Sequence, residues 1–332
     1  MASDIYTQSD FLMIKTACMY YLENMQQQQI SEKLNISVTT VSRLLKRAKE
    51  EKVIKYVIED KYMHCIQLAG QLRNRYGLEE VIVAYDRGEN IPTGKKRKMV
   101  ALEAARYLQR IIQKNDVLGI SWGRIVCNMM LYLNPSHKVD STFVTLHGKL
   151  GNCISEDVES LVKKMAKAFS GNNYYLKSEA LMPDVAQADA VRRQPDTRKV
   201  YDMFDKINLS ITGEGAWAPE KKSILAEYGV LSEEEQDLLE TYGVVGDLGL
   251  RFFNEKGEPC DGELGNRLIA ISLEQFKRIE RKITVAAGLE KTYTLDCALR
   301  GGLIDVLILD EELAEALLRI SSSFSRDTAL TE

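Results

Sequence analysis

The chain has 332 residues, which at about 150 residues per domain predicts two domains rather than one small module. Hydrophobic residues make up 45% and charged residues 28%, and only 21 Gly and 6 Pro occur, so collagen-like, Pro-rich and largely disordered chains are excluded. The net charge of −4 means that a nucleic-acid partner would need a local basic region, because the whole chain offers no positive field.

The sequence also lacks the marks of a membrane or exported protein. It has no run of about 18 apolar residues, and its first residues, MASDIYTQSDF, lack the basic start and apolar core of a signal peptide. Six scattered cysteines form no Cys-x-x-Cys pair, and the three histidines have no metal-ligand spacing. We therefore expect a cytoplasmic protein with reduced thiols, no membrane partner, no cofactor and no metal.

Residues 9 to about 50 show helical periodicity only, with helices predicted over 10–24, 26–34 and 37–51. The apolar residues of the second and third segments are spaced as in a helix-turn-helix, with the turn at Asn35 and Ile36 and with Ser37 as a natural N-cap. Between Lys33 and Lys55 there are seven cations and two anions. This net charge of +5 is the local basic region that DNA binding requires.

The third segment is the predicted recognition helix. Its exposed face would place short hydroxyls near base edges and long cations beside phosphates. The predicted DNA-contacting residues are Gln28, Ser37, Thr39, Thr40, Ser42, Arg43, Lys46 and Arg47. The alternative is a plain helical bundle with a solvated charged face, but spacing, capping and charge together favour DNA binding. Residues 53–60 alternate like a short strand, which predicts a winged-helix-like domain over 1–60 and a second domain over 61–332.

From Leu78 onward, short β-branched runs alternate with helical stretches, which predicts βαβ units and a parallel sheet in an α/β fold. The predicted strands lie within 79–85, 116–123, 141–148, 206–215, 282–290 and 305–310. Residues 243–263 predict a hairpin, with its turn at the KGEP sequence of 256–259.

The segment from Gln27 to Leu45 resembles the N-terminal module of the SorC/DeoR-type sugar-responsive bacterial regulators. That family usually has Q-x-E-I-A followed by L-G-I-S-R-x-T-V-S-R-L-L. Here Gln29, Ser31, Asn35 and Val38 replace Glu, Ala, Gly and Arg. The resemblance implies a DNA-binding regulator, but the Val38 replacement removes an expected DNA contact, so the family's operator preference does not carry over.

The resemblance continues at residues 116–123, which look like the family's D-x-(I/L)-G-(I/V)-(S/G)-(W/F)-G. A strand that ends in a Gly turn before a helix offers backbone N–H groups to an anion, and Arg124 adds a cation. Many family members have a hydroxyl residue next, where this chain has Ile125 and Val126. Without the resemblance, the same pattern is also typical of an ordinary packing turn.

Two further loops match the family with departures. Residues 144–151 resemble V-x-L-x-G-G-x-G with Lys149 at the second glycine, which either puts a cation beside the ligand or blocks its approach. Gly213-Glu214-Gly215 resembles G-(I/V)-G, with Glu214 in place of the aliphatic residue. Whether Lys149, Ile125 and Glu214 alter or abolish the family's ligand site stays open.

Near the C-terminal end, residues 243–247 resemble the family's G-A-V-G-D and residues 287–291 resemble A-G-G-x-x-K. Asp247 from its spacing alone is equally typical of a helix cap, whereas the resemblance makes it an acceptor for sugar hydroxyls. Lys291 suits an anionic, hydroxylated ligand, and its alternative is a solvated surface lysine.

The resemblance covers nearly the whole chain and implies a transcriptional regulator, expected to be a repressor, that responds to a phosphorylated sugar. It also implies a Rossmann-like α/β domain resembling sugar-phosphate isomerases, with the ligand at the carboxyl ends of the strands. The predicted effector-binding residues are Gly119, Ser121, Trp122, Gly123, Arg124, His147, Gly148, Lys149, Gly213, Gly215, Asp247 and Lys291.

No catalytic residues are predicted, because no base at a strand end is paired with a second acid or with an orienting group. The alternatives are a phosphosugar isomerase or lyase, and a DNA-binding oligomerisation scaffold without a functional ligand-binding site. The expected partners are double-stranded operator DNA, a phosphorylated sugar and further copies of the chain in a dimer or tetramer. The helix predicted over 63–77 either links the domains or pairs subunits.

Overall fold

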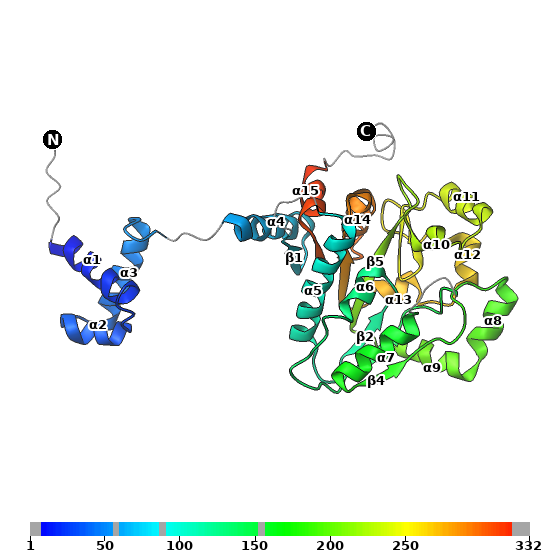
Figure 1. Cartoon of the computed structure of the whole chain (residues 1–332), viewed down its shortest axis with the longest axis horizontal. Helices are drawn as coiled ribbons and strands as arrows, with labels where there is room; N and C mark the ends of the chain where they lie inside the picture. Colours follow the sequence, from blue (N-terminus) through cyan, green and yellow to red (C-terminus); the bar gives the residue numbers. More distant parts are fainter. Residues whose placement is uncertain (1–7, 56–59, 86–90, 152–156, 321–332) are drawn as a thin grey trace. The chain divides into compact units, whose positions relative to one another are not determined.

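The computed structural model describes residues 8–55, 60–85, 91–151 and 157–320 (Figure 1). The chain divides into two compact units, Met1–Glu59 and Asp60–Glu332, and each is described here by itself.

The N-terminal unit consists of the three predicted helices, α1 (Gln8–Tyr21), α2 (Gln27–Leu34) and α3 (Val38–Glu50). Asn35 ends α2 in a left-handed conformation with φ of 50°, and the Ser37 hydroxyl accepts a hydrogen bond from the Thr40 N–H at 3.1 Å. Ile30 of α2 and Val41 of α3 are fully buried against each other's helices. The helix-turn-helix predicted from spacing and capping is therefore confirmed.

The strand predicted over 53–60 is wrong in its described part. Lys52 has a φ of 57°, and the N–H groups of Val53 and Ile54 both donate to the Ala48 carbonyl, which folds the chain back over the end of α3. Ile54 packs on the small core formed by α1 and α3, so its apolar character serves a turn rather than a strand. Residues 56–59 lie outside the described residues, and Asp60 already begins α4.

The second unit is built on a parallel sheet with the strand order β1-β9-β8-β5-β2-β3-β4. Its strands are β1 (Glu80–Ala84), β2 (Val117–Ile120), β3 (Thr142–Thr145), β4 (Asn172–Tyr174), β5 (Leu209–Ala216), β8 (Arg281–Ala286) and β9 (Val306–Asp310). Each neighbouring pair in this order is parallel, which confirms the predicted parallel α/β fold.

Helices cover both faces of this sheet, because alternate residues of the buried strands point to opposite sides. In β9, Val306 and Ile308 face the core formed with α5, α6 and α7, whereas Leu307 and Leu309 face the core formed with α4, α9, α14 and α15 (Figure 1). The helices are α4 (Asp60–Tyr76), α5 (Thr93–Ile111), α6 (Arg124–Met129), α7 (Val158–Phe169), α8 (Val185–Arg193), α9 (Pro195–Phe204), α10 (Ile224–Glu227), α11 (Glu233–Thr241), α12 (Gly262–Arg267), α13 (Leu273–Lys277), the 3₁₀ helix η1 (Leu289–Lys291), α14 (Thr292–Arg300) and α15 (Glu311–Arg319). No helix among the described residues is long and apolar enough to cross a membrane.

A hairpin of β6 (Gly246–Leu248) and β7 (Arg251–Phe253) confirms the predicted excursion. The KGEP sequence makes its predicted turn after β7, where Phe253 pairs antiparallel with Pro259, but a further turn joins β6 to β7. Gly249 and Leu250 make the turn with φ of 58° and 65°, as a tight two-residue hairpin loop requires. Gly257 closes the turn after β7, where its N–H donates to the Asn254 carbonyl.

The strand order reverses between β2 and β5. From β2 the chain adds β3 and β4 on one side, and from β5 it adds β8 and β9 on the other. The loops that leave β2 and β5 therefore diverge, which opens a crevice at the carboxyl edge of the sheet where α/β folds bind ligands. Because β6 pairs antiparallel with the end of β5, it brings Asp247 to this same edge opposite Gly215.

Candidate functional site

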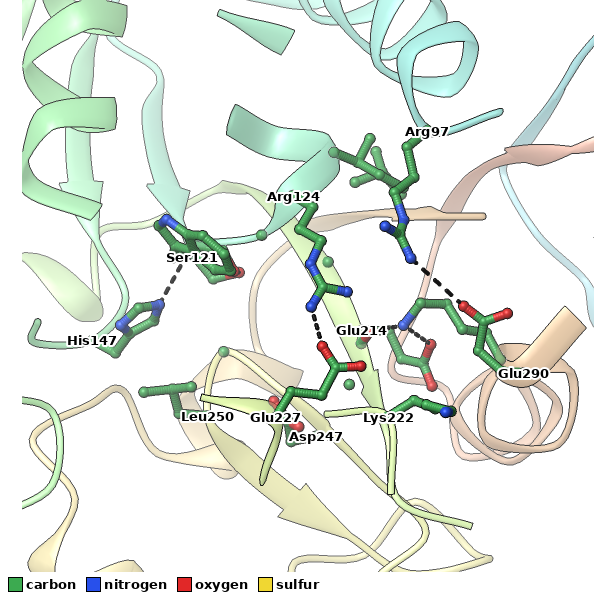
Figure 2. A pocket seen from close by; sticks show the side chains of 18 residues that line it. Arg97, Ser121, Arg124, His147, Glu214, Lys222, Glu227, Asp247, Leu250 and Glu290 are labelled. Carbon is green, nitrogen blue, oxygen red and sulfur yellow. Dashed lines mark hydrogen bonds and ion pairs between the residues drawn. The ribbon is translucent and has the colours of Figure 1, made fainter. Parts of the chain in front are cut away.

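A cleft lies at this carboxyl edge (Figure 2). Nine of the predicted effector-binding residues line it: Ser121, Trp122, Gly123, Arg124, His147, Gly213, Gly215, Asp247 and Lys291. The structure therefore brings these separate segments together at one cleft, as expected. Contacts between these residues and a ligand stay a prediction.

The turn after β2 is held in place by His147. The Trp122 N–H donates to Nε2 of His147 at 2.9 Å, and Nδ1 of the same ring lies 2.7 Å from the Gly148 carbonyl, so the ring is neutral with its proton on Nδ1. Burial lowers the pKa of His147 to about 4, which keeps it neutral. The Trp122 N–H is thus already bonded, and only the later N–H groups of the turn, from Gly123 onward, remain for an anion.

Arg124 begins α6 and supplies the predicted cation. Gly123 precedes it at the N-cap position with no side chain to cap the helix. The Arg124 guanidinium forms an ion pair with Glu227 of α10 and lies 5.7 Å from the centre of the Tyr228 ring. Figure 2 shows this pair at the cleft, so an anionic ligand would have to compete with Glu227 for Arg124.

Asp247 is buried within β6, which makes the helix-cap interpretation wrong. Its Oδ1 accepts hydrogen bonds from the Ser223 hydroxyl at 2.8 Å and from Trp217 Nε1 at 3.2 Å, and no described residue donates to Oδ2. Burial raises the pKa of the Asp247 carboxyl. Gly215 is required beside it, since a Cβ there would lie 2.0 Å from Asp247 Oδ1.

Lys291 ends η1 and is largely buried, which makes the surface-lysine interpretation wrong. Its Nζ donates to the backbone carbonyl of Glu214 and lies 3.3 Å from Glu214 Oε2. Burial raises the pKa of Glu214 to about 7, although the Lys291 charge opposes that shift. Residue 214, where this chain has Glu in place of the aliphatic residue of the family pattern, therefore puts a buried acid into the wall of the cleft.

Gly119, Gly148 and Lys149 do not line the cleft. A Cβ on Gly119 would lie 2.6 Å from the Leu146 side chain, and a Cβ on Gly148 would lie 2.5 Å from the Ser178 carbonyl. These glycines thus allow close packing within the sheet and its neighbouring loop. Lys149 pairs with Glu159 at 3.1 Å instead.

Sequence reasoning missed several lining residues, namely Arg97, Lys222, Glu227, Gly249, Leu250, Val285 and Glu290. Arg97 of α5 pairs with Glu290 at 3.8 Å across the cleft (Figure 2). The charged side chains lining the cleft balance, with Arg97, Arg124, Lys222 and Lys291 against Glu214, Glu227, Asp247 and Glu290. Among the residues that the structure describes, no group of acids, histidines and cysteines is arranged to hold a metal.

On the N-terminal unit, the predicted DNA-contacting side chains lie mainly on the exposed face of α3. Thr39, Ser42, Arg43 and Lys46 are exposed, opposite the buried Val41. Gln28 is exposed at the start of α2, while the Ser37 and Thr40 hydroxyls bond to each other at 2.8 Å across the cap of α3.

Arg47 differs from the other predicted contacts. Its guanidinium pairs with Asp10 of α1 and with Glu51, both at 2.6 Å. These acids raise the pKa of Arg47. The side chain therefore ties α3 to α1, and a contact of Arg47 with DNA stays a prediction.

A helix-turn-helix with an exposed basic helix, joined in one chain to a parallel α/β unit with a polar cleft, defines a ligand-responsive DNA-binding regulator. Residues 60–319 match the family model described as "Putative sugar-binding domain", and residues 19–51 match "Sigma-70, region 4". The chain belongs to the SorC/DeoR family of sugar-binding transcriptional regulators.

The chain is similar over almost its full length to known regulators. It is 29% identical to the deoxyribonucleoside regulator of Bacillus subtilis, over 92% of this chain and 97% of the relative. It is 26% identical to the sorbitol operon regulator of Klebsiella pneumoniae, over 93% of this chain and 98% of the relative. The crystal structure of that full-length regulator, SorC, superposes with a TM-score of 0.72 at 26% identity, covering 93% of this chain and 98% of SorC. These relatives are transcriptional regulators and not isomerases or lyases.

Proposed function

We propose that a phosphorylated sugar binds in the cleft and controls the affinity of the helix-turn-helix for its operator, the chain acting as a cytoplasmic repressor that its effector releases. The observation that carries this proposal is the buried Asp247 carboxylate. Its Oδ2 has no donor among the residues that the structure describes, and it lies in a cleft that also holds four cations. A ligand that bears both hydroxyl groups and an anion matches that set of groups.

The sugar end of the ligand is assigned to Asp247. A hydroxyl group donates to Oδ2, while Trp217 and Ser223 keep Oδ1 in place. The names of relatives support hydroxylated ligands, since they refer to deoxyribonucleosides, sorbitol and erythritol.

The phosphate is assigned to Arg124 and the start of α6. The uncapped Gly123 and the first-turn N–H groups of α6 supply donors, and Arg124 exchanges its Glu227 partner for the phosphate. Lys291 contributes positive charge from the opposite segment.

Operator binding is assigned to α3. Arg43 and Lys46 contact phosphates, and the hydroxyls of Thr39 and Ser42 approach base edges, because these side chains share the exposed face. Paired half-sites are the usual means by which one short recognition helix gains specificity.

We therefore propose a homodimer or tetramer. Ile66 on α4 is 61% exposed, whereas its neighbours Cys65 and Leu68 are buried in the core of the second unit. Light scattering of the full chain at micromolar concentration, with and without DNA, checks this. A stable monomer under both conditions would contradict it.

Thermal unfolding in the presence of a set of phosphorylated sugars tests the effector assignment. A ligand at a hundred times its dissociation constant adds about 2.7 kcal/mol of stability, which raises the melting temperature measurably. The same sugar should release the protein from DNA. If no phosphorylated sugar raises the melting temperature, the result would contradict the proposal. It would favour the alternative of a DNA-binding scaffold without a functional ligand-binding site.

A further inference from the structure

Glu214 lies where β5 leaves the parallel sheet. Gly213 is the last residue of β5 that pairs with β8, and Glu214 is the first that pairs with the hairpin strand β6, opposite Leu248. This position directs Glu214 into the cleft wall, where its side chain is fully buried.

One oxygen of this buried carboxyl group lacks a protein partner. Lys291 contacts Oε2, but Oε1 has no hydrogen-bond partner among the described residues. Buried polar atoms in native proteins are nearly always hydrogen-bonded, and leaving one unsatisfied is costly. A donor from a bound ligand would satisfy Oε1.

The surroundings of Glu214 disfavour a second anion. Asp247 is also buried and stands one register position away, opposite Gly215. Burial raises the pKa of both acids, and the Lys291 ammonium group opposes that rise in each, but it is already engaged by Glu214. Arg124, the other cation drawn at this part of the cleft, is engaged by Glu227 (Figure 2).

Building on the proposed function, we propose that Glu214 is a specificity-determining residue that accepts a hydrogen bond from a ligand hydroxyl and excludes ligands with an anionic group at that end. The ligand class is then a sugar or polyol that carries one phosphate and ends in an alcohol rather than in a carboxylate or a second phosphate. A carboxylate on the ligand would lie beside the two buried acids Glu214 and Asp247, which share the one ammonium group of Lys291. Repulsion between like charges at such short range is strongly unfavourable.

Four matched probes separate this inference from the phosphate assignment. Sorbitol, sorbitol 6-phosphate, gluconate and 6-phosphogluconate share one hydroxylated chain and differ in the phosphate at one end and in alcohol or carboxylate at the other. Calorimetric titration of the full chain should show sorbitol 6-phosphate binding at least about tenfold tighter than 6-phosphogluconate.

The variant Glu214→Gln keeps the size of the side chain and one acceptor oxygen but removes the charge. We expect it to reduce the discrimination between alcohol and acid to less than about threefold, mainly by tightening binding of 6-phosphogluconate. Glu214→Val, which restores an aliphatic residue of the family pattern, should also lose the discrimination and serves if Glu214→Gln does not fold. Circular dichroism and the melting temperature without ligand report on folding of both variants.

The outcomes distinguish the two proposals. Equal binding of alcohol and acid by the wild-type chain, or discrimination that survives in both variants, would overturn the role of Glu214. Equal binding of the phosphorylated and unphosphorylated forms would overturn the phosphate assignment, while a persisting preference for the alcohol would still support Glu214. If none of the four probes binds to any of the proteins, both proposals fail.

Discussion

Arg43 and Lys46 on α3 extend into solvent, whereas Arg124 and Lys291 in the cleft are each held by an acid from another element. Lys46 has only the exposed Glu50 nearby, at 3.8 Å, and no described residue pairs with Arg43. Exposed charges attract a polyanion over a distance set by the salt concentration, while charges already paired within a cleft respond to the geometry of one ligand. The exposed cations of α3 are therefore suited to binding DNA phosphates, and the paired charges of the cleft are suited to selecting one effector.

The difference has a cost for the ligand. A phosphate that approaches α3 displaces mainly water and counterions. A phosphate that approaches Arg124 must replace the Glu227 carboxylate, so only a ligand with enough further contacts gains net affinity. The hydroxyl acceptor Asp247 and the neighbouring Glu214 supply those contacts in the proposed complex.

Removing Lys291 should have the largest effect on stability. Lys291→Met leaves the buried Glu214 without its ammonium partner, which should lower the free energy of unfolding by about 3 kcal/mol at pH 8. The loss should shrink toward pH 6, because the raised pKa of Glu214, about 7, lets that carboxyl take up a proton. Urea unfolding at both pH values measures it.

Lys222→Met is the matched control for that experiment. Lys222 also lines the cleft, but it pairs with the exposed Glu220 at 3.4 Å, so its removal should change stability by less than about 0.5 kcal/mol. If Lys291→Met and Lys222→Met lower the free energy of unfolding equally, burial of the Lys291–Glu214 ion pair is not the cause of the loss of stability.

His147 should make the wild-type protein sensitive to acid. The pKa of its ring is about 4 in the folded state and about 6.5 when unfolded, so the unfolded state binds more protons between these values. Stability should therefore be complete above pH 6.5 and fall by about 3 kcal/mol as the pH drops toward 4. His147→Gln should remove this part of the pH dependence of urea unfolding, and an unchanged slope would show that the ring is not buried and neutral.

Asp247→Ala tests whether the Asp247 carboxylate binds the hydroxyl groups of the ligand. Loss of hydrogen bonds to a charged group costs about 1.5–3 kcal/mol, so the affinity for the sugar phosphate should fall by about tenfold or more. Calorimetric titration measures it, with circular dichroism as the check on folding. Wild-type affinity in this variant would misplace the effector site.

The surface cations should show the smallest effect per residue. Arg43→Ala and Lys46→Ala should each reduce the slope of log affinity for DNA against log salt by about 0.9, if each side chain contacts one phosphate. Arg47→Ala should instead destabilise the N-terminal unit, because it removes the ion pair with Asp10. An unchanged slope in the first two variants would remove α3 from the DNA interface.

Local patterns predicted the three N-terminal helices and six of the seven parallel strands, because their apolar periodicity is strong and each is fixed by burial. The short, mostly exposed strand β4 (Asn172–Tyr174) lacks such a pattern and was missed. Local patterns also predicted that residues following β2 and β5 meet, since parallel strands place their carboxyl ends at one edge. Glycine patterns were ambiguous: Gly215 borders the cleft beside Asp247, whereas Gly119 and Gly148 are needed for packing elsewhere.

The missed residues come from elements whose distance to the cleft is set by tertiary packing. Arg97 and Glu227 belong to helices, and nothing in their local sequence indicates which turn of the helix reaches the sheet edge. The ion pair of Arg47 was missed for a related reason, because its partner Asp10 lies 37 positions away on α1. The turn at the KGEP sequence was predicted, but the Gly249-Leu250 turn between β6 and β7 was missed, because its residues are weaker turn formers and the pairing of β6 with β5 selects it.

DNA affinity measured with and without a bound sugar phosphate tests the central claim most directly. A DNA fragment selected by the wild-type chain from a random pool is titrated by fluorescence anisotropy, at fixed salt, in the presence and absence of the phosphorylated sugar that gives the largest thermal shift. Coupling free energies between sites are typically 1–3 kcal/mol, so the sugar should lower the DNA affinity of the wild-type chain by about tenfold and that of Asp247→Ala by less than about twofold. Unchanged DNA affinity of the wild-type chain, while calorimetry shows the sugar bound, would contradict control of the helix-turn-helix by the cleft.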